Sequence, residues 1–129
     1  MPTPNNPDPG AQVGQVLLRL QYQDLARRRV DLPTLEDVEF RCHSQNGEDG
    51  ILLYIFALLG TTNRKVVEIC AGDGIECNAA NLLVNHGWNG LLFDGDDEQI
   101  ARGRAFTRPV GTRGSRRRRS STHGSRPMW

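Results

Sequence analysis

A glycine-containing turn is the part of this sequence whose residue types and spacing best suit chemistry. Residues 66–74 read VVEICAGDG, an apolar β-branched run followed at once by Gly72 and Gly74. Glycines after a buried strand leave backbone N–H groups free and let a ligand approach the main chain. A second apolar run ends in Asp94, 22 residues after Gly72, where a carboxylate can accept hydrogen bonds from both ribose hydroxyls. The pattern predicts a site for an adenosine-containing cofactor.

Acidic side chains around the turn restrict the type of cofactor. Glu68, Asp73 and Asp94 would repel a pyrophosphate, and Cys77 stands where the motif Gly-x-Gly-x-x-Gly requires its third glycine. A cofactor with a positive centre tolerates these acids, and S-adenosylmethionine is such a cofactor. Two alternatives stay open: an NAD-type dinucleotide-binding fragment, and a turn that only joins a strand to a helix while the site lies elsewhere.

The turn is expected to lie in a strand–helix–strand unit. Strands are predicted at 66–70 and 91–94, with a helix over 75–86 that ends at Gly87 and a turn at Asn89-Gly90. The span from 66 to 94 is close to the ~30 residues of a βαβ unit, whose right-handed crossover makes the two strands parallel.

Two further helices are predicted upstream of this unit. Residues 11–29 carry an apolar stripe at helical spacing and end in three arginines. The stripe consists of Val13, Val16, Leu17 and Leu20. Residues 51–59 are apolar on all sides, so this second helix must be buried, with Ser44 or Asn46 as its cap and Gly60 after its end.

Two separated motifs resemble the FkbM-type methyltransferase family. They are SQNGEDG at 44–50 and VEICAGDG at 67–74, followed by GLLFD at 90–94, so the resemblance covers about residues 40–98. It implies an α/β fold, here an incomplete Rossmann-like methyltransferase domain with parallel strands and flanking helices. It also implies S-adenosylmethionine as cofactor and O-methyl transfer to a small molecule or sugar.

The resemblance assigns cofactor contacts to nine residues. Those of the turn and the ribose are Glu68, Gly72, Asp73, Gly74 and Asp94, and those of the methionine side are Ser44, Gln45, Glu48 and Asp49. Helix capping is the alternative role for Ser44 and Glu48. Cys70 stands where the family has the first glycine of its turn, so its side chain is expected to narrow the approach to the cofactor.

Charge divides the chain into two parts. Residues 1–100 hold seven basic and fifteen acidic side chains, whereas residues 101–129 hold nine arginines and no acid. We expect a disordered lead at 1–10, the domain at 11–100 and a disordered Arg-rich tail at 101–129. Because little chain follows Asp94, we expect an inactive, truncated or frameshifted form, with no catalytic residue or methyl acceptor assigned. The alternative is that the tail binds nucleic acid or an acidic membrane surface through counterion release.

The remaining composition narrows the class of protein. Cys42, Cys70 and Cys77 have no metal-ligand spacing with the histidines, so no metal site is expected. The longest apolar run, 51–59, falls short of the ~20 residues that cross a bilayer, and the polar N-terminus does not resemble a signal peptide. A cytoplasmic protein without a transmembrane segment is expected, and its oligomeric state stays open.

Overall fold

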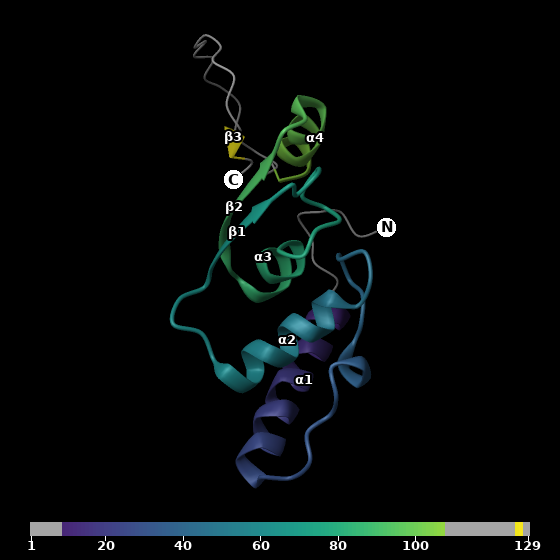
Figure 1. Ribbon diagram of the computed structural model, residues 1–129, viewed down its shortest axis with the longest axis vertical. Coiled ribbons are helices and arrows are strands. Elements are labelled where there is room, and N and C mark those ends of the chain that lie inside the picture. The colour runs from purple at the N-terminus through teal and green to yellow at the C-terminus, as the bar shows by residue number, and fades with distance from the viewer. Residues whose placement is uncertain (1–8, 108–125, 128–129) are drawn as a thin grey trace.

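A pair of long helices lies beside a small sheet in the computed structural model, which describes residues 9–107 and 126–127 (Figure 1). The elements, in chain order, are α1 (Pro9–Arg28), the 3-10 helix η1 (Glu36–Val38), α2 (Glu48–Leu59), β1 (Lys65–Ile69), α3 (Ala80–His86), β2 (Asn89–Asp94), α4 (Asp97–Thr107) and β3 (Arg126–Pro127). The described residues exclude the lead up to residue 8 and the tail residues 108–125 and 128–129. The alternative that the tail binds nucleic acid or a membrane surface concerns these tail residues. No described helix has the length and apolarity needed to cross a bilayer.

The sheet confirms the predicted parallel strand pair. β1 pairs with β2 in parallel, with Val67 opposite Leu91 and Ile69 opposite Phe93. The short β3 adds an antiparallel strand on the other side of β2. The fold is therefore mixed α/β, compatible with part of a Rossmann-like fold.

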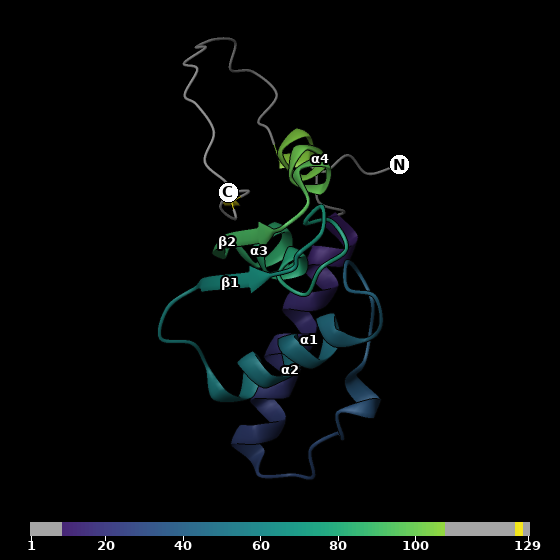
Figure 2. The same ribbon diagram turned by 45° about the horizontal axis from the view of Figure 1, so that its top comes forward.

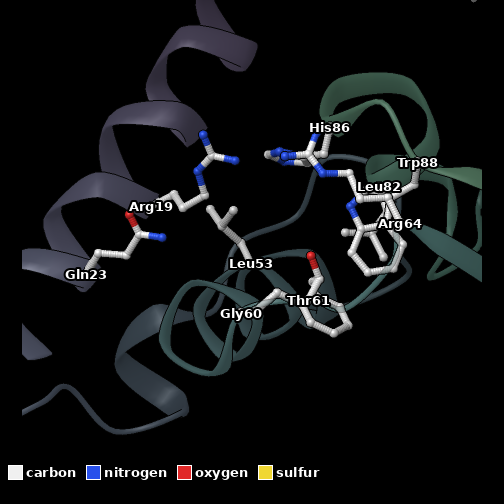
Figure 3. Close-up of a pocket in the computed structure, with 10 residues that line it drawn as sticks. Arg19, Gln23, Leu53, Gly60, Thr61, Arg64, Leu82, His86 and Trp88 are labelled. Carbon is white, nitrogen blue, oxygen red and sulfur yellow. The ribbon is translucent and has the colours of Figure 1, made fainter.

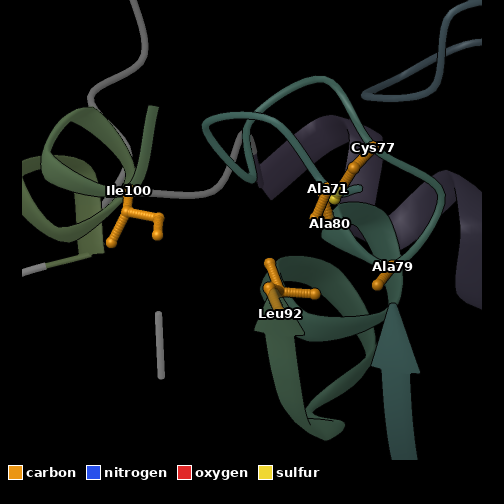
Figure 4. Close-up of a cluster of buried hydrophobic side chains, with 6 residues drawn as sticks. All are labelled: Ala71, Cys77, Ala79, Ala80, Leu92 and Ile100. Atoms are coloured by element: carbon orange, nitrogen blue, oxygen red, sulfur yellow. The ribbon is translucent and has the colours of Figure 1, made fainter. Parts of the chain in front are cut away.

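One face of the sheet is covered and the other is open. Leu92 is fully buried on the covered face, where α3 packs against the strands (Figures 2 and 4). This sheet core also contains Ala71, Cys77, Ala79, Ala80 and Ile100, with Val66 and Leu83 at its margin. On the opposite face Val67, Ile69 and Leu91 are 61%, 75% and 43% exposed. Nothing among the described residues covers these three side chains.

A second core joins α1 to α2, which lie side by side in both views (Figures 1 and 2). The rings of Tyr22 and Tyr54 meet edge to face with their centroids 4.9 Å apart, and the Tyr54 hydroxyl donates to the Pro33 carbonyl at 2.8 Å. Val38 of η1 and Ala57 of α2 complete the buried set. Within the apolar stretch 51–59 only Leu53, Tyr54 and Ala57 are buried, and Leu59 is 82% exposed, so the expected burial of this helix is only partly confirmed.

The predicted apolar stripe of α1 does not face the core. Val13, Leu17 and Leu20 are 59%, 60% and 49% exposed, whereas Gln15 and Tyr22 are buried. The helix is present as predicted, but the prediction of which face it buries is wrong. The reason is that the face of α1 that turns inward carries Gln15 and Tyr22, two helical turns apart, with Gln15 against α3 and Tyr22 against α2.

Gln15 belongs to a polar network that joins α1 to α3. Its amide exchanges two hydrogen bonds with the amide of Asn81, at 3.2 and 2.9 Å, and Asn85 Nδ2 donates to Asn81 Oδ1 at 2.8 Å. His86 Nε2 lies 2.7 Å from Gln15 Oε1. Buried amides need partners, so this reciprocal pairing fixes the rotation of α1 against an otherwise apolar preference.

The boundaries of α3 and β2 differ from prediction. α3 begins at Ala80 rather than at residue 75, because residues 72–79 form a turn held by side-chain hydrogen bonds. Asn89 and Gly90 belong to β2 and do not form a turn. A Cβ on Gly90 would lie 2.8 Å from a Val66 methyl and 2.9 Å from a Leu83 methyl, so close packing explains this glycine.

α4 extends across residue 100, where the change in composition predicted the end of the domain and the start of the disordered tail. Asp96 Oδ1 accepts the Glu98 N–H at 2.8 Å at the start of this helix, and Ile100 is buried in the sheet core. The predicted absence of structure is therefore wrong for residues 101–107 and 126–127 of the tail, and for residues 9–10 of the lead, which begin α1.

Candidate cofactor site

The glycine turn and the acid predicted to hold the ribose meet at the carboxyl ends of β1 and β2. Gly72 N–H donates to Asp94 Oδ2 at 2.8 Å, and Asp96 N–H donates to Asp94 Oδ1 at 2.9 Å. These N–H groups, that of Asp96 first, lower the pKa of Asp94 and keep it ionised. The Gly95 backbone lowers this pKa as well, and a carboxylate has about four acceptor positions, so Asp94 can still accept a further donor.

The turn itself is shaped by positive backbone angles. Cys70, Gly72 and Gly74 have φ of 61°, 59° and 71°. Asp73 Oδ1 accepts the Ile75 N–H at 3.0 Å, and the Ala71 carbonyl accepts the Gly74 N–H at 2.9 Å. Both glycine N–H groups thus have acceptors within the protein, and the expectation that they are free for a ligand is wrong.

Glu68 holds the beginning of α3. Its two oxygens accept the backbone N–H groups of Asn78, at 3.1 Å, and Ala79, at 2.7 Å. Such donors have no partner within a helix and are commonly satisfied by a carboxylate, which also suits the positive helix end. Glu68 therefore positions the turn between β1 and α3, a role that its place inside a strand did not indicate.

A cavity of about 200 Å³ opens beside this turn. It is lined by Gln45, Glu48, Glu68, Cys70, Glu76, Cys77 and Asn78. Of its three carboxylates, that of Glu76 pairs with the exposed Arg41 at 3.1 Å. The cavity is consequently acidic, and it suits a positively charged group better than a phosphate.

Three lining residues were missed by sequence reasoning. Glu76, Cys77 and Asn78 lie in the stretch that was predicted as helix, where the hydrogen bonds of Asp73 and Glu68 to the backbone hold a turn instead. Burial, and then the nearby Glu68 carboxylate, raise the pKa of Cys77 to about 12. This thiol stays protonated and does not act as a nucleophile at neutral pH.

Cys70 is exposed and lines the cavity, as its expected effect on the cofactor approach requires. Its φ of 61° lies in the region that side chains with a Cβ rarely adopt. This backbone conformation favours glycine, the residue that the FkbM-type turn has at the position of Cys70.

The 44–50 segment consists of a short loop, residues 44–47, and the first three residues of α2. Asp49 Oδ2 accepts three backbone N–H groups, from Cys42 at 2.7 Å, His43 at 2.6 Å and Ser44 at 2.9 Å. In return Ser44 Oγ accepts the Asp49 N–H at 3.2 Å. Both side chains are buried, at 0% and 1% exposure, so they build the loop and do not line the cavity.

The two remaining residues of this motif do reach the cavity. Gln45 and Glu48 line it, and Glu48 also accepts the Asn46 N–H at 2.9 Å. Gly50 lies directly beneath the chain at 38–40, because a Cβ there would collide with the carbonyl of Val38. The loop thus carries Gln45 and Glu48 on a base formed by buried backbone contacts.

The nine residues predicted for the cofactor therefore fall into three groups. The cavity is lined by Gln45, Glu48 and Glu68; the turn and its acid are Gly72, Asp73, Gly74 and Asp94; the loop base is Ser44 and Asp49. Among the described residues no cluster of three or more His, Cys, Asp or Glu side chains is placed to hold a metal ion. Comparisons with family models, with curated proteins and with solved structures give no match for this chain.

Proposed function

We propose that the chain binds S-adenosylmethionine at the carboxyl ends of β1 and β2, as the cofactor half of a Rossmann-like methyltransferase domain. In such a domain the sulfonium methyl group passes to an acceptor, here an oxygen of a small molecule or sugar. The proposal for this chain is limited to cofactor binding, because no described side chain is placed as a general base towards an acceptor.

The hydrogen bond between Gly72 and Asp94 supports the proposal most directly. It joins the turn after β1 to the end of β2 across 22 residues, at the edge of a parallel sheet where α/β proteins bind nucleotide-type ligands. The ionised Asp94 retains acceptor capacity beyond its backbone donors, which suits a ribose hydroxyl.

The charge of the cavity distinguishes the candidate cofactors. Glu48, Glu68 and Glu76 oppose a pyrophosphate and favour the positive sulfonium and ammonium groups of S-adenosylmethionine. A volume of about 200 Å³ is below the ~300–1,000 Å³ of sites that enclose a whole ligand. The cavity is therefore expected to hold the methionine part while the adenosine lies along the turn.

Calorimetric titration of the full chain with three ligands tests this function. We expect S-adenosylmethionine to bind about five- to tenfold more tightly than S-adenosylhomocysteine, which has the same ribose but an uncharged sulfur, and NAD not to bind. Asp94→Asn should weaken both adenosyl ligands alike, while Glu48→Gln should mainly reduce the difference between them.

Asp97→Asn is the matched control, since Asp97 is exposed in the first turn of α4 and lines no part of the cavity. Circular dichroism of each variant checks that it is folded. NAD binding without S-adenosylmethionine binding would replace the proposal by the dinucleotide alternative, and absence of binding by all three ligands would overturn it.

A further inference from the structure

A second cavity lies at the opposite end of β1, where the strands begin. Its volume is about 150 Å³, and it is bounded by α1, α2, α3 and the segments that enter β1 and β2 (Figure 3). The polar lining consists of Arg19, Gln23, Thr61, Arg64 and His86, and the apolar lining of Leu53, Phe56, Leu82 and Trp88 with Gly60. None of these residues belongs to the cofactor site.

The charged side chains that line this cavity are positive. Arg19 and Arg64 come from different elements, and Figure 3 shows both side chains reaching towards His86. Neither arginine takes part in the ion pairs of the described residues, although residues 1–100 contain fifteen acidic side chains. No acidic residue lines the cavity.

The pKa of His86 indicates that the positive charge of the two arginines acts on the partly buried ring beside the cavity. Burial lowers the pKa of His86 most, and Arg19 and then Arg64 lower it further, against a smaller opposing effect of Asp49. The ring is held by Gln15 Oε1, 2.7 Å from Nε2, so it forms a fixed wall between the two guanidinium groups and the polar network.

We propose that this cavity binds the phosphate group of a small phosphomonoester, through Arg19 and Arg64. Two guanidinium groups match the double charge of a phosphate monoester, and each presents a planar set of N–H donors suited to two oxygens. Thr61 also lines the cavity, and its hydroxyl is a further donor.

The size and apolar wall of the cavity agree with a ligand of this kind. A cavity of ~150 Å³ accommodates a group of benzene size, which is enough for a phosphate and its first substituent. The rings of Phe56 and Trp88 lie 4.8 Å apart at an interplanar angle of 47° and form an apolar wall beside the arginines. An organic phosphate is therefore expected to bind more tightly than inorganic phosphate.

Trp88 fluorescence in a Trp129→Phe background provides the test, because the chain has two tryptophans and only Trp88 then remains. Full-length protein is titrated with phenyl phosphate, inorganic phosphate, acetate and chloride at constant ionic strength. We expect a saturable response to both phosphates, stronger for phenyl phosphate, with acetate weaker and chloride without effect.

The variant Arg19→Gln/Arg64→Gln should weaken phosphate binding about tenfold or more, since charged hydrogen bonds are lost on both sides. Arg27→Gln/Arg28→Gln removes the same charge from the exposed end of α1 and should leave binding unchanged. If the first double variant does not fold, as judged by circular dichroism, each single variant should still weaken binding about fivefold.

Equal binding by the two double variants, or a response to chloride equal to that to phosphate, would show general charge screening and overturn the proposal. Unchanged binding in both single variants would do the same. The cofactor titration is independent of these results, because its residues lie at the other end of β1.

Discussion

The two ends of β1 carry cavities of opposite charge. At the carboxyl end Glu48, Glu68 and Glu76 surround about 200 Å³, and at the amino end Arg19 and Arg64 border about 150 Å³. A net charge of +1 conceals this separation. A short strand can thus separate two cavities of opposite charge, because each cavity is built from the loops and helices that meet at its own strand end.

α2 connects the two cavities and should be the most sensitive element. It contributes Glu48 to the acidic cavity and Leu53 and Phe56 to the basic one. Its beginning depends on Asp49, which holds the preceding loop by three hydrogen bonds. A change there is expected to disturb both ends.

The largest predicted effect is that of Asp49→Ala. It leaves three backbone N–H groups in a partly buried loop without their acceptor, and we expect the free energy of unfolding to fall by about 3 kcal/mol. Urea denaturation followed by circular dichroism measures this change. Asn46→Ala, in the exposed part of the same loop, should cost less than about 1 kcal/mol, and an equally small loss for Asp49→Ala would contradict the role of the loop base.

Removal of Glu68 and removal of Glu76 from the acidic cavity should lower the free energy of unfolding by different amounts. Glu68→Ala loses the acceptor of two N–H groups at the start of α3 and should cost about 1.5 kcal/mol. Glu76→Ala loses only an exposed ion pair with Arg41 and should cost about 0.5 kcal/mol or less.

Both of these variants lower the negative charge of the acidic cavity by one, so both should weaken S-adenosylmethionine binding. The comparison of their unfolding midpoints with their calorimetric affinities therefore separates structural support from electrostatic attraction. Retention of full affinity by both would remove the charge argument for the acidic end.

Cys70→Gly should stabilise the protein. Relief of the left-handed conformation of a residue with a Cβ contributes about 1–2 kcal/mol, and the larger chain entropy of glycine offsets part of it, so a net gain of about 0.5–1 kcal/mol is expected. Cys70→Ala keeps the Cβ and should change little. Thermal unfolding of the two variants distinguishes backbone strain from an effect of the thiol.

The smallest predicted effect is a pH dependence at the basic end. The pKa of His86 is lower in the folded chain than its ordinary value near 6.5, so the unfolded chain binds the proton more readily. The free energy of unfolding is therefore unaffected by protonation of His86 above about pH 6.5. It decreases as the pH falls from there through the pKa of His86 in the folded chain. In phosphate-free buffer, wild type should lose more stability than His86→Gln between pH 7.5 and pH 5; equal losses would contradict this.

The strand pair and the turn could be predicted from sequence because their signals are local. The β-branched run before Gly72 and the spacing to Asp94 specify two parallel strands and their common edge. Only some of the residues that line the acidic cavity could be predicted from the sequence. Gln45, Glu48 and Glu68 belong to the recognised motifs, whereas Glu76 and Cys77 depend on a turn whose geometry is fixed by side-chain acceptors.

The remaining differences have non-local causes. The orientation of α1 follows from the pairing of Gln15 with Asn81, 66 residues away, which outweighs the apolar stripe. The basic cavity joins Arg19, Arg64 and His86, which have no characteristic spacing in the chain. α4 was missed because arginine-rich composition obscured a short helix that Asp96 begins and Ile100 anchors.

The uncovered sheet face has a consequence for the behaviour of the chain in solution. Val67 and Ile69 of β1 and Leu91 of β2 form an apolar surface, and β1 is an edge strand of the described sheet. Unpaired backbone groups next to apolar side chains are a template for β-pairing between molecules, and hence for aggregation. The concentration at which light scattering first rises should therefore increase when Ile69, the most exposed of the three, is replaced by lysine.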